Sequence, residues 1–223
     1  RELSERDAMV EGTVSIGCGD LAAVQMLPEL FRSFHERYPA VTFDLYTATA
    51  DHIKDRMDRG LTDAGLLLEP VNMEKYDYIR LSQREEWVAV MHPDSPLAKR
   101  DAITPKDLAG LPLILPRRFN VQSELSGWFG EEFDKLHVLF TSNLPSVSSI
   151  MAHHKLAYSL TIRGSVSFWD PAKIACRPLS PKLTATSVLA WKRKQPFGLA
   201  AAKFIQYAKE ALYAKQQNNP GRS

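Results

Sequence analysis

The stretch from Gly12 to Pro39 constrains the fold most strongly, because it places a strand, a glycine-containing turn and a helix in immediate succession. Val14 and Ile16 alternate with polar residues, which predicts a strand. An apolar stripe predicts the helix that follows, and Pro39 cannot extend it. The stripe consists of Leu27, Leu30, Phe31, Phe34 and Tyr38. Backbone N–H groups at such a junction point toward a ligand, so we expect function at Gly17–Ala23.

The same succession of elements continues along the chain. Val41–Tyr46 alternates again, with Val41, Phe43 and Leu45 on one side, and predicts a second strand. Asp51–Arg59 is a predicted helix, and Gly60 suits its C-terminal cap. The apolar run Ala64–Leu68 predicts a strand covered on both faces. This β-α-β-α-β order implies a parallel sheet with right-handed crossovers.

A second β-α-β-α-β series follows two further predicted strands, Tyr78–Leu81 and Trp87–Met91. Its predicted elements are a one-turn helix after the N-cap Thr104, a strand at Leu113–Leu115, a helix at Ser123–Asp134, a strand at Leu136–Phe140, a helix from the N-cap Ser142 to Ala152, and a strand at Leu156–Leu160. A strand at Thr186–Trp191 and a helix at Phe197–Ala214 complete the chain. We therefore predict an α/β protein with two Rossmann-like lobes.

Composition excludes several classes of function. With 28 basic and 26 acidic residues among 223, the net charge of +2 is too even for nucleic-acid binding by this segment alone. No apolar run approaches the roughly 18 residues that a membrane helix needs. Cys18 and Cys176 form no CxxC pair, so we expect no metal site, and free thiols favour the cytoplasm. We find no nucleophile–base pair and no phosphate loop, and predict neither an enzyme nor a cofactor.

Several short motifs, in their order and spacing, resemble the effector-binding domain of LysR-type transcriptional regulators over about residues 10–213. In the first lobe, the matching motifs are Gly12–Gly17 as the entry strand, Leu27-Pro28 through Phe34 to Tyr38-Pro39 as the first helix, and the turn of Gly60 with Asp63-Ala64. The crossover into the second lobe is matched by Trp87–Met91, His92-Pro93, Pro96–Ala98 and Asp107–Pro112. Each motif alone is weak, but together they are specific.

The resemblance implies a periplasmic-binding-protein-like fold of type II, in which a hinge of two crossover strands joins two lobes around a cleft. It makes residues 1–11 the end of a linker helix, 12–84 with 187–214 regulatory lobe I, 85–186 regulatory lobe II, and 215–223 a disordered tail. It also implies an absent N-terminal winged helix-turn-helix that binds DNA, and a homodimer that becomes a tetramer in the full-length protein.

Ligands of open α/β sheets bind at the carboxyl ends of the strands, which selects one group of effector-binding candidates in the first lobe. They are Gly19, Asp20, Leu21, Ala22, Thr47 and Thr49. Family members often have a Ser or Thr where Leu21 and Ala22 stand, so only backbone N–H groups and Asp20 remain here. Either this stretch binds a more apolar or aromatic effector, or it is a plain strand–helix turn.

The same rule selects a second group of candidates in the second lobe. They are Arg117, Arg118, Phe119, Asn120, Ser142, Asn143 and Thr161. Either Arg117 or Arg118 pairs bidentately with a carboxylate, or both are solvated loop charges. Phe119 either stacks on a ring of the effector or plugs the loop.

Three further features complete the predictions. In the family, the first helix and the second strand form the dimer contact, so we expect Leu30, Arg32, His35, Glu36 and Tyr46 at an interface; the alternative is a solvated helix face. His153 and His154 are adjacent and do not share a helix face as a metal pair would. Lys155 stands where the family has a glycine-containing helix end, and there it has to adopt a positive φ.

The predicted function is effector sensing. A small molecule in the interlobe cleft would alter oligomer geometry, and with it DNA binding by the absent N-terminal domain. The change is limited by the ligand's differential affinity for the two states. The alternative is a free-standing solute-binding protein of the same fold.

Overall fold

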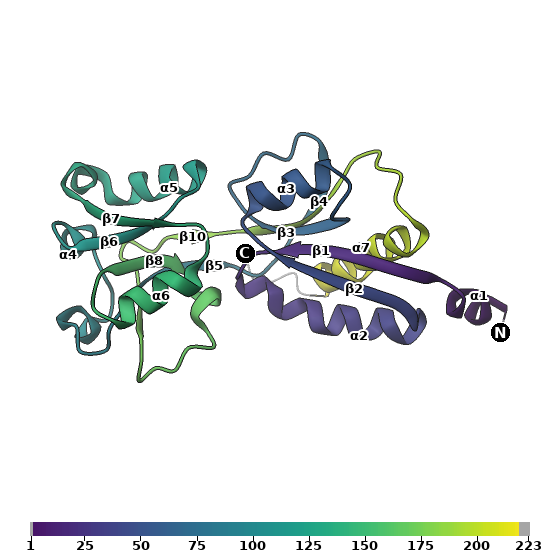
Figure 1. Ribbon diagram of the computed structural model, residues 1–223, viewed down its shortest axis with the longest axis horizontal. Helices are drawn as coiled ribbons and strands as arrows, with labels where there is room; N and C mark the ends of the chain where they lie inside the picture. The colour runs from purple at the N-terminus through teal and green to yellow at the C-terminus, as the bar shows by residue number, and fades with distance from the viewer. Residues whose placement is uncertain (1, 219–223) are drawn as a thin grey trace. The chain divides into compact units, whose positions relative to one another are not determined.

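The computed structural model describes residues 2–218, which form two compact units (Figure 1). Within these residues, unit 1 comprises the chain up to Gly19, Ala23–Gln83, and the chain from Thr186 onward. Unit 2 comprises Arg84–Ala185 together with the short segment Asp20–Ala22. Each unit has its own sheet and is described by itself below.

The sheet of unit 1 has five strands in the order β2-β1-β3-β11-β4. These strands are β1 (Glu11–Cys18), β2 (Ala40–Thr47), β3 (Ala64–Leu68), β4 (Tyr76–Arg80) and β11 (Ser187–Lys192). Strands β1, β2 and β3 are parallel, which confirms the predicted β-α-β-α-β series, and β11 runs antiparallel to both β3 and β4. Val41 is buried, whereas Leu45, on the same face of the edge strand β2, is 57% exposed.

The helices of this part of the chain are α1 (Glu2–Ala8), the 3₁₀ helix η1 (Ala22–Met26), α2 (Leu27–Arg37), α3 (Ala50–Asp58) and α7 (Leu199–Gln217). The apolar stripe of α2 faces the core as predicted. Phe34 is fully buried and packs against the rings of Tyr38 at 4.5 Å, Phe204 at 5.3 Å and Phe43 at 5.9 Å between centroids. Gly60 has a φ of +70°, which confirms its place at the end of α3.

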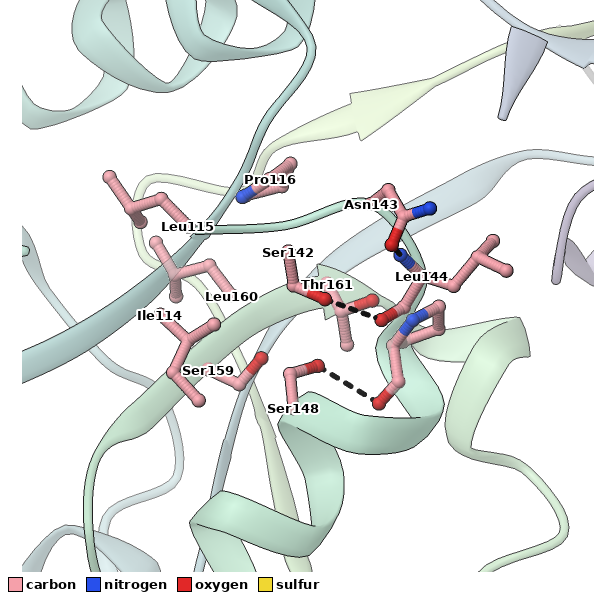
Figure 2. A pocket seen from close by; sticks show the side chains of 11 residues that line it. Ile114, Leu115, Pro116, Ser142, Asn143, Leu144, Ser148, Ser159, Leu160 and Thr161 are labelled. Atoms are coloured by element: carbon pink, nitrogen blue, oxygen red, sulfur yellow. Dashed lines mark hydrogen bonds between the residues drawn. The ribbon is translucent and has the colours of Figure 1, made fainter. Parts of the chain in front are cut away.

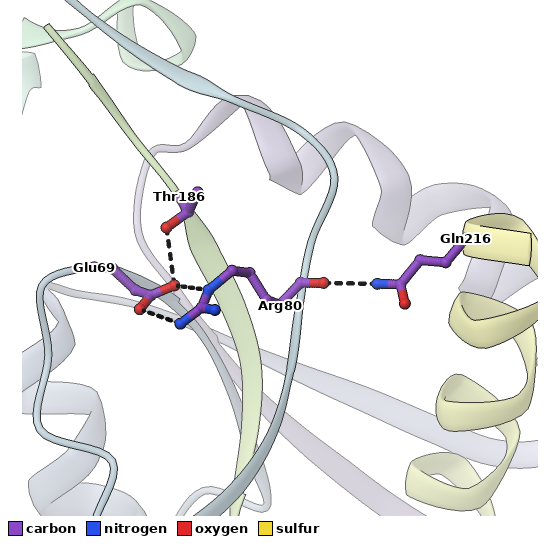
Figure 3. A network of polar contacts seen from close by, with 4 residues as sticks. All are labelled: Glu69, Arg80, Thr186 and Gln216. Atoms are coloured by element: carbon purple, nitrogen blue, oxygen red, sulfur yellow. Dashed lines mark hydrogen bonds and ion pairs between the residues drawn. The ribbon is translucent and has the colours of Figure 1, made fainter. Parts of the chain in front are cut away.

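Helix α7 continues to Gln217, so the predicted disordered tail at 215–223 is wrong for its first three residues. The side-chain Nε2 of Gln216 donates to the carbonyl oxygen of Arg80 at 2.8 Å and ties the last turn of the helix to the end of β4 (Figure 3). The remainder of the predicted tail, residues 219–223, lies outside the described residues.

A polar network joins the ends of three strands in unit 1 (Figure 3). The Arg80 guanidinium donates to Glu69 twice, from Nε at 2.8 Å and from Nη2 at 3.0 Å, and Thr186 donates to the same carboxylate at 2.9 Å. Hydrogen bonding to Arg80 holds the pKa of Glu69 below its usual range. The network therefore braces β4 and β11 where the chain leaves and re-enters unit 1.

The sheet of unit 2 has six strands, in the order β10-β5-β8-β6-β7, with β9 paired to β5. These strands are β5 (Glu85–Met91), β6 (Pro112–Pro116), β7 (His137–Ser142), β8 (Tyr158–Ile162), β9 (Ala175–Pro178) and β10 (Thr184–Ala185). Strand β6 is parallel to β7 and β8, and β5 is antiparallel to β8, β9 and β10. Strands β9 and β10 were not predicted, because each is too short to show an alternating pattern.

The helices of unit 2 are η2 (Pro96–Lys99), α4 (Pro105–Leu108), α5 (Phe119–Phe129), η3 (Gly130–Lys135), α6 (Pro145–His153) and η4 (Arg163–Val166). Thr104 and Asp107 form a capping box, which confirms Thr104 as an N-cap. Helix α5 starts four residues before the predicted Ser123. Ser142 is wrong as an N-cap, because it ends β7, and Leu144 precedes α6.

Candidate functional site

A small cavity lies where the parallel strands β6, β7 and β8 end (Figure 2). It has a volume of about 40 Å³ and is lined by these strand ends and the first turn of α6. It brings together the predicted residues Ser142, Asn143 and Thr161 with Ser148 and Ser159, which were not predicted. Because about 10–15 Å³ of such volume is enough to hold one water, this cavity admits only a small polar group of a ligand.

Two of the hydroxyl groups that line this cavity, those of Ser142 and Ser148, act as acceptors. Ser142 Oγ donates to the carbonyl oxygen of Leu144 at 2.7 Å, and Ser148 Oγ donates to that of Pro145 at 2.9 Å, as Figure 2 shows. A hydroxyl has one hydrogen and two lone pairs. Each hydroxyl hydrogen is therefore engaged, and lone pairs of Ser142 and Ser148 remain for a donor group of a ligand.

The hydroxyl hydrogen of Thr161 is also engaged, through a chain of two hydrogen bonds. Its Oγ1 lies 3.0 Å from Ser165 Oγ, and Ser165 Oγ in turn lies 2.6 Å from the carbonyl oxygen of Ile162. A carbonyl only accepts, so Ser165 donates to Ile162 and Thr161 donates to Ser165. Thr161 thus also presents an acceptor to the cavity.

The first turn of α6 offers this cavity no backbone donor. The N–H of Leu144, which precedes the helix, donates to Asn143 Oδ1 at 3.0 Å, and Pro145 has no N–H. Ser146 and Val147, whose N–H groups have no partner within the helix, do not line the cavity. The cavity therefore presents hydroxyl acceptors, an arrangement complementary to a ligand hydroxyl that donates its hydrogen.

The predicted turn at Asp20–Ala22 packs against other residues of unit 2. The Ala22 N–H donates to Glu85 Oε2 at 2.9 Å, and Glu85 is fully buried. A Cβ atom on Gly164 would lie 2.1 Å from the Ala22 nitrogen, so this approach requires glycine. The Ala22 N–H, which we expected to face a ligand, is thus engaged by the protein itself.

Neither partner of this turn was found from the sequence. Gly164 lies in the 3₁₀ helix η4, two residues after the end of β8, and no local pattern there marks a close backbone approach. Glu85 belongs to the charged run Arg84–Glu86, a pattern that predicts solvent exposure, although Glu85 is buried.

The other predicted residues of the first group differ in exposure. Asp20 is half-buried, and burial raises the pKa of its carboxyl group. Gly19 is half-buried and Leu21 is buried. In unit 1, Thr47 ends β2 and is exposed, and Thr49 precedes α3 without a side-chain cap bond.

The residues predicted after β6 do not line the cavity. Arg117 is exposed, and its backbone N–H donates to the carbonyl oxygen of Ser142 at 2.9 Å. Arg118 is half-buried at the start of α5, and Asn120 is exposed in its first turn. The side chain of Phe119 lies outside the described part of the structure.

The predicted interface residues divide by burial. Arg32, His35 and Glu36 are exposed on α2, whereas Leu30 is buried against its own unit. Tyr46 is half-buried, and the guanidinium carbon of Arg56 lies 4.0 Å from the centre of its ring.

Within residues 2–218 no group of three or more His, Cys, Asp or Glu residues has the geometry of a metal site, and no helix is both long and apolar enough to cross a membrane. Cys18 is buried in unit 1, Cys176 is half-buried in unit 2, and neither forms a disulfide.

Known proteins resemble this chain over nearly its whole length. The sequence profile of the LysR substrate binding domain matches residues 8–213. The uncharacterized HTH-type transcriptional regulator YvbU of Bacillus subtilis (strain 168) is 30% identical over 205 residues, which are 92% of this chain and 69% of YvbU. The Hca operon transcriptional activator HcaR of Escherichia coli (strain K12) is 25% identical over 203 residues, which are 89% of this chain and 68% of HcaR.

Solved structures share the fold. The effector binding domain of QuiR, in complex with shikimate, matches with a TM-score of 0.78 at 17% identity, over 92% of this chain and 99% of that one. The regulatory domain of CcmR from Synechocystis PCC6803, in complex with 2-PG, matches with a TM-score of 0.73 at 14% identity, over 91% and 98%. The fold is thus the α/β, type II periplasmic-binding-protein-like fold.

These relatives are transcriptional regulators rather than enzymes, and the matches do not favour a free-standing solute-binding protein. The profile match covers both units and all residues of the hydroxyl-lined cavity. The chain therefore belongs to the LysR substrate-binding domain family, whose members sense effectors in LysR-type transcriptional regulators.

Proposed function

We propose that this chain controls DNA binding by a longer regulator, and that its effector places a hydroxyl group in the cavity formed by Ser142, Ser148 and Thr161. The observation that carries this proposal is the set of hydroxyl acceptors that Ser142, Ser148 and Thr161 present to one cavity. The complex of QuiR with shikimate, a hydroxylated acid, supports the same ligand chemistry.

The turn at Asp20–Ala22 limits the charge of the effector. The Ala22 N–H is engaged by Glu85, and Asp20 adds a carboxyl group whose pKa is raised by burial. Neither group favours an anion. We therefore propose an effector with no more than one acidic group, which binds elsewhere than at this turn. Of the predicted residues, Thr47, Thr49, Arg117, Arg118 and Asn120 stay candidates for that contact.

Thermal unfolding in the presence of shikimate and of other hydroxylated and non-hydroxylated ring acids tests the effector proposal. A ligand that binds only the folded chain stabilises it by about 2.7 kcal/mol at a concentration of 100 times its Kd. We expect a rise in Tm for hydroxylated compounds. Failure of every hydroxylated compound to raise Tm would contradict the proposal.

Two variants make this test specific. Thr161→Val and Ser148→Ala each remove one acceptor from the cavity, and either variant should weaken binding of an active compound by about tenfold, in line with one hydrogen bond. Ser146→Ala is the matched control, because Ser146 lies exposed in the same helical turn and does not line the cavity. Equal losses in all three variants would show that the compound binds elsewhere.

We also propose that the exposed face of α2 and the edge strand β2 form a homodimer interface through Arg32, His35, Glu36 and Tyr46. Support comes from the position of β2 at the edge of its sheet and from its exposed residue Leu45. Light scattering at high protein concentration should give twice the monomer mass of 25.1 kDa, and Glu36→Arg should reduce it. A monomer at every concentration would refute this interface.

In the full-length regulator, we propose that such dimers assemble into a tetramer in the cytoplasm, where an N-terminal winged helix-turn-helix binds DNA. The match spans 69% of YvbU, so that regulator has length beyond the matched domain. DNA binding by the full-length protein, measured with and without an active compound, tests whether the two events are coupled. An affinity for DNA that the compound leaves unchanged would contradict coupling.

A further inference from the structure

A second and larger cavity lies in unit 2, apart from the hydroxyl-lined cavity. It has a volume of about 220 Å³ and shares none of its lining residues with that first cavity. Its floor is formed by the buried residues Met91, Ala152 and Ala157. Since an apolar cavity of about 150 Å³ holds benzene, this volume accommodates one six-membered ring with a substituent.

The apolar floor suits an aromatic ring. Met91 comes from β5 and is almost fully buried, and methionine sulfur makes favourable contacts with aromatic rings. Ala152 and Ala157 add no polar atoms of their own side chains. A planar hydrocarbon ring can therefore cover this floor without leaving a buried polar side chain unpaired.

Polar groups at the rim of the cavity are mainly donors. Nδ1 of His92 accepts the backbone N–H of Asp94 at 3.0 Å, so the proton of the neutral ring resides on Nε2, which is a donor. Lys155 supplies an ammonium group. The single rim carboxylate, Asp94, is 75% exposed and lies 3.6 Å from Lys155 Nζ.

Two hydroxyl groups supply one more donor. Ser95 Oγ and Tyr158 Oη lie 2.6 Å apart, and Ser95 Oγ also accepts the N–H of Leu97 at 3.3 Å. Whichever of the two hydroxyls donates to the other, one hydroxyl hydrogen of the pair is left over. The rim thus offers an ammonium group, an imidazole N–H and one O–H to an acceptor.

The backbone of Lys155 is strained. Its φ is +62°, as predicted for this position, and L residues disfavour this region. The N–H of Leu156 donates to Met151 and that of Lys155 to Ala152, both at 3.1 Å, which is a helix ending that glycine normally closes. Strain of this kind gathers at ligand sites.

We propose that the cavity beside His92 and Lys155 is a second small-molecule site, which binds a monocyclic aromatic carboxylate. The ring covers the floor at Met91, and the carboxylate takes the donors of Lys155, His92 and the hydroxyl pair. The proposal does not depend on the function proposed for the first cavity.

Benzoate is the probe for this site, and benzamide is its uncharged counterpart. The 223-residue chain is labelled with ¹³C at its methionine methyl groups, and the Met91 signal is assigned by its loss in Met91→Leu. We expect benzoate to shift the Met91 signal saturably, because a bound ring lies against it, and benzamide to bind at least about fivefold more weakly. A Met91 signal that benzoate does not move, or that both probes move equally, would overturn the proposal.

Lys155→Gly separates binding from folding. Glycine relieves the strained φ, so this variant should unfold at a higher temperature than the parent chain while its affinity for benzoate falls about tenfold. Lys194→Gly is the matched control, because Lys194 is an exposed lysine in unit 1 with a φ of +58°. It should gain stability and keep the affinity for benzoate. Equal benzoate affinity in the two variants would refute the role of Lys155 and with it the proposed site.

Discussion

Gly164→Ala should detach the Asp20–Ala22 turn from its position in unit 2. A Cβ atom at residue 164 would lie 2.1 Å from the nitrogen and 2.6 Å from the Cα of Ala22, and 2.7 Å from the carbonyl carbon of Leu21. All three atoms belong to the backbone, so no side-chain rotation relieves the overlap. Ordinary contact begins at 3.4 Å, so the two segments must separate by about 1.3 Å.

The energetic cost follows from two effects. The Ala22 N–H lies 2.9 Å from Glu85 Oε2, and a separation of about 1.3 Å exceeds what this hydrogen bond tolerates. Overpacking costs about 1–3 kcal/mol, and loss of a buried hydrogen bond to a carboxylate adds about 1.5–3 kcal/mol. We expect Gly164→Ala to lower the free energy of unfolding by about 3–5 kcal/mol.

Urea denaturation measures the loss of stability, and hydrogen exchange at the Ala22 amide locates it. Exchange at this amide should accelerate about tenfold or more, since each 1.4 kcal/mol corresponds to a factor of ten. Gly127→Ala is the control: Gly127 lies in α5, and a Cβ atom there would meet no atom within 4 Å, so alanine should stabilise by about 0.5–1 kcal/mol. Unchanged stability and an equally protected Ala22 amide in Gly164→Ala would show that residue 164 does not press against the Ala22 backbone.

Three further outcomes are expected. Phe34→Ala should cost about 3–5 kcal/mol in urea denaturation, because Phe34 is fully buried among aromatic rings; a loss under about 1 kcal/mol would contradict this packing. The pKa of Glu69 is held low by Arg80, so the ion pair stabilises the fold above the usual value of 4.5 and is lost as pH falls through the lowered pKa. Glu69→Gln should therefore flatten the acid limb of stability against pH, and an unaltered limb would count against the pairing. Burial raises the pKa of the Cys176 thiol, so a thiol reagent at about pH 8 should react with it more slowly than with free cysteine; faster reaction would show that the thiol is not shielded.

The alternating and helical patterns predicted most strands and helices, because an element that buries one face places its apolar residues at regular spacing along the sequence. The stripe of α2 and the cap at Gly60 are examples, whereas the positive φ of Lys155 was predicted from the family resemblance. Local patterns failed where a distant partner decides the outcome. Helix α7 extends past the predicted end, and Gln216 in this last turn bonds to Arg80 of a distant strand.

For the candidate site, local sequence was enough to predict polar residues at the strand ends, among them Ser142, Asn143 and Thr161. Which groups join them, and which hydrogen bonds these groups already make, depends on the packing of distant segments. Ala22 and Glu85 are 63 residues apart, and no local pattern couples a backbone N–H to a carboxylate at that distance. A polar group buried by the fold must find a partner wherever the packing brings one, so the chain as a whole decides which donors and acceptors are left for a ligand.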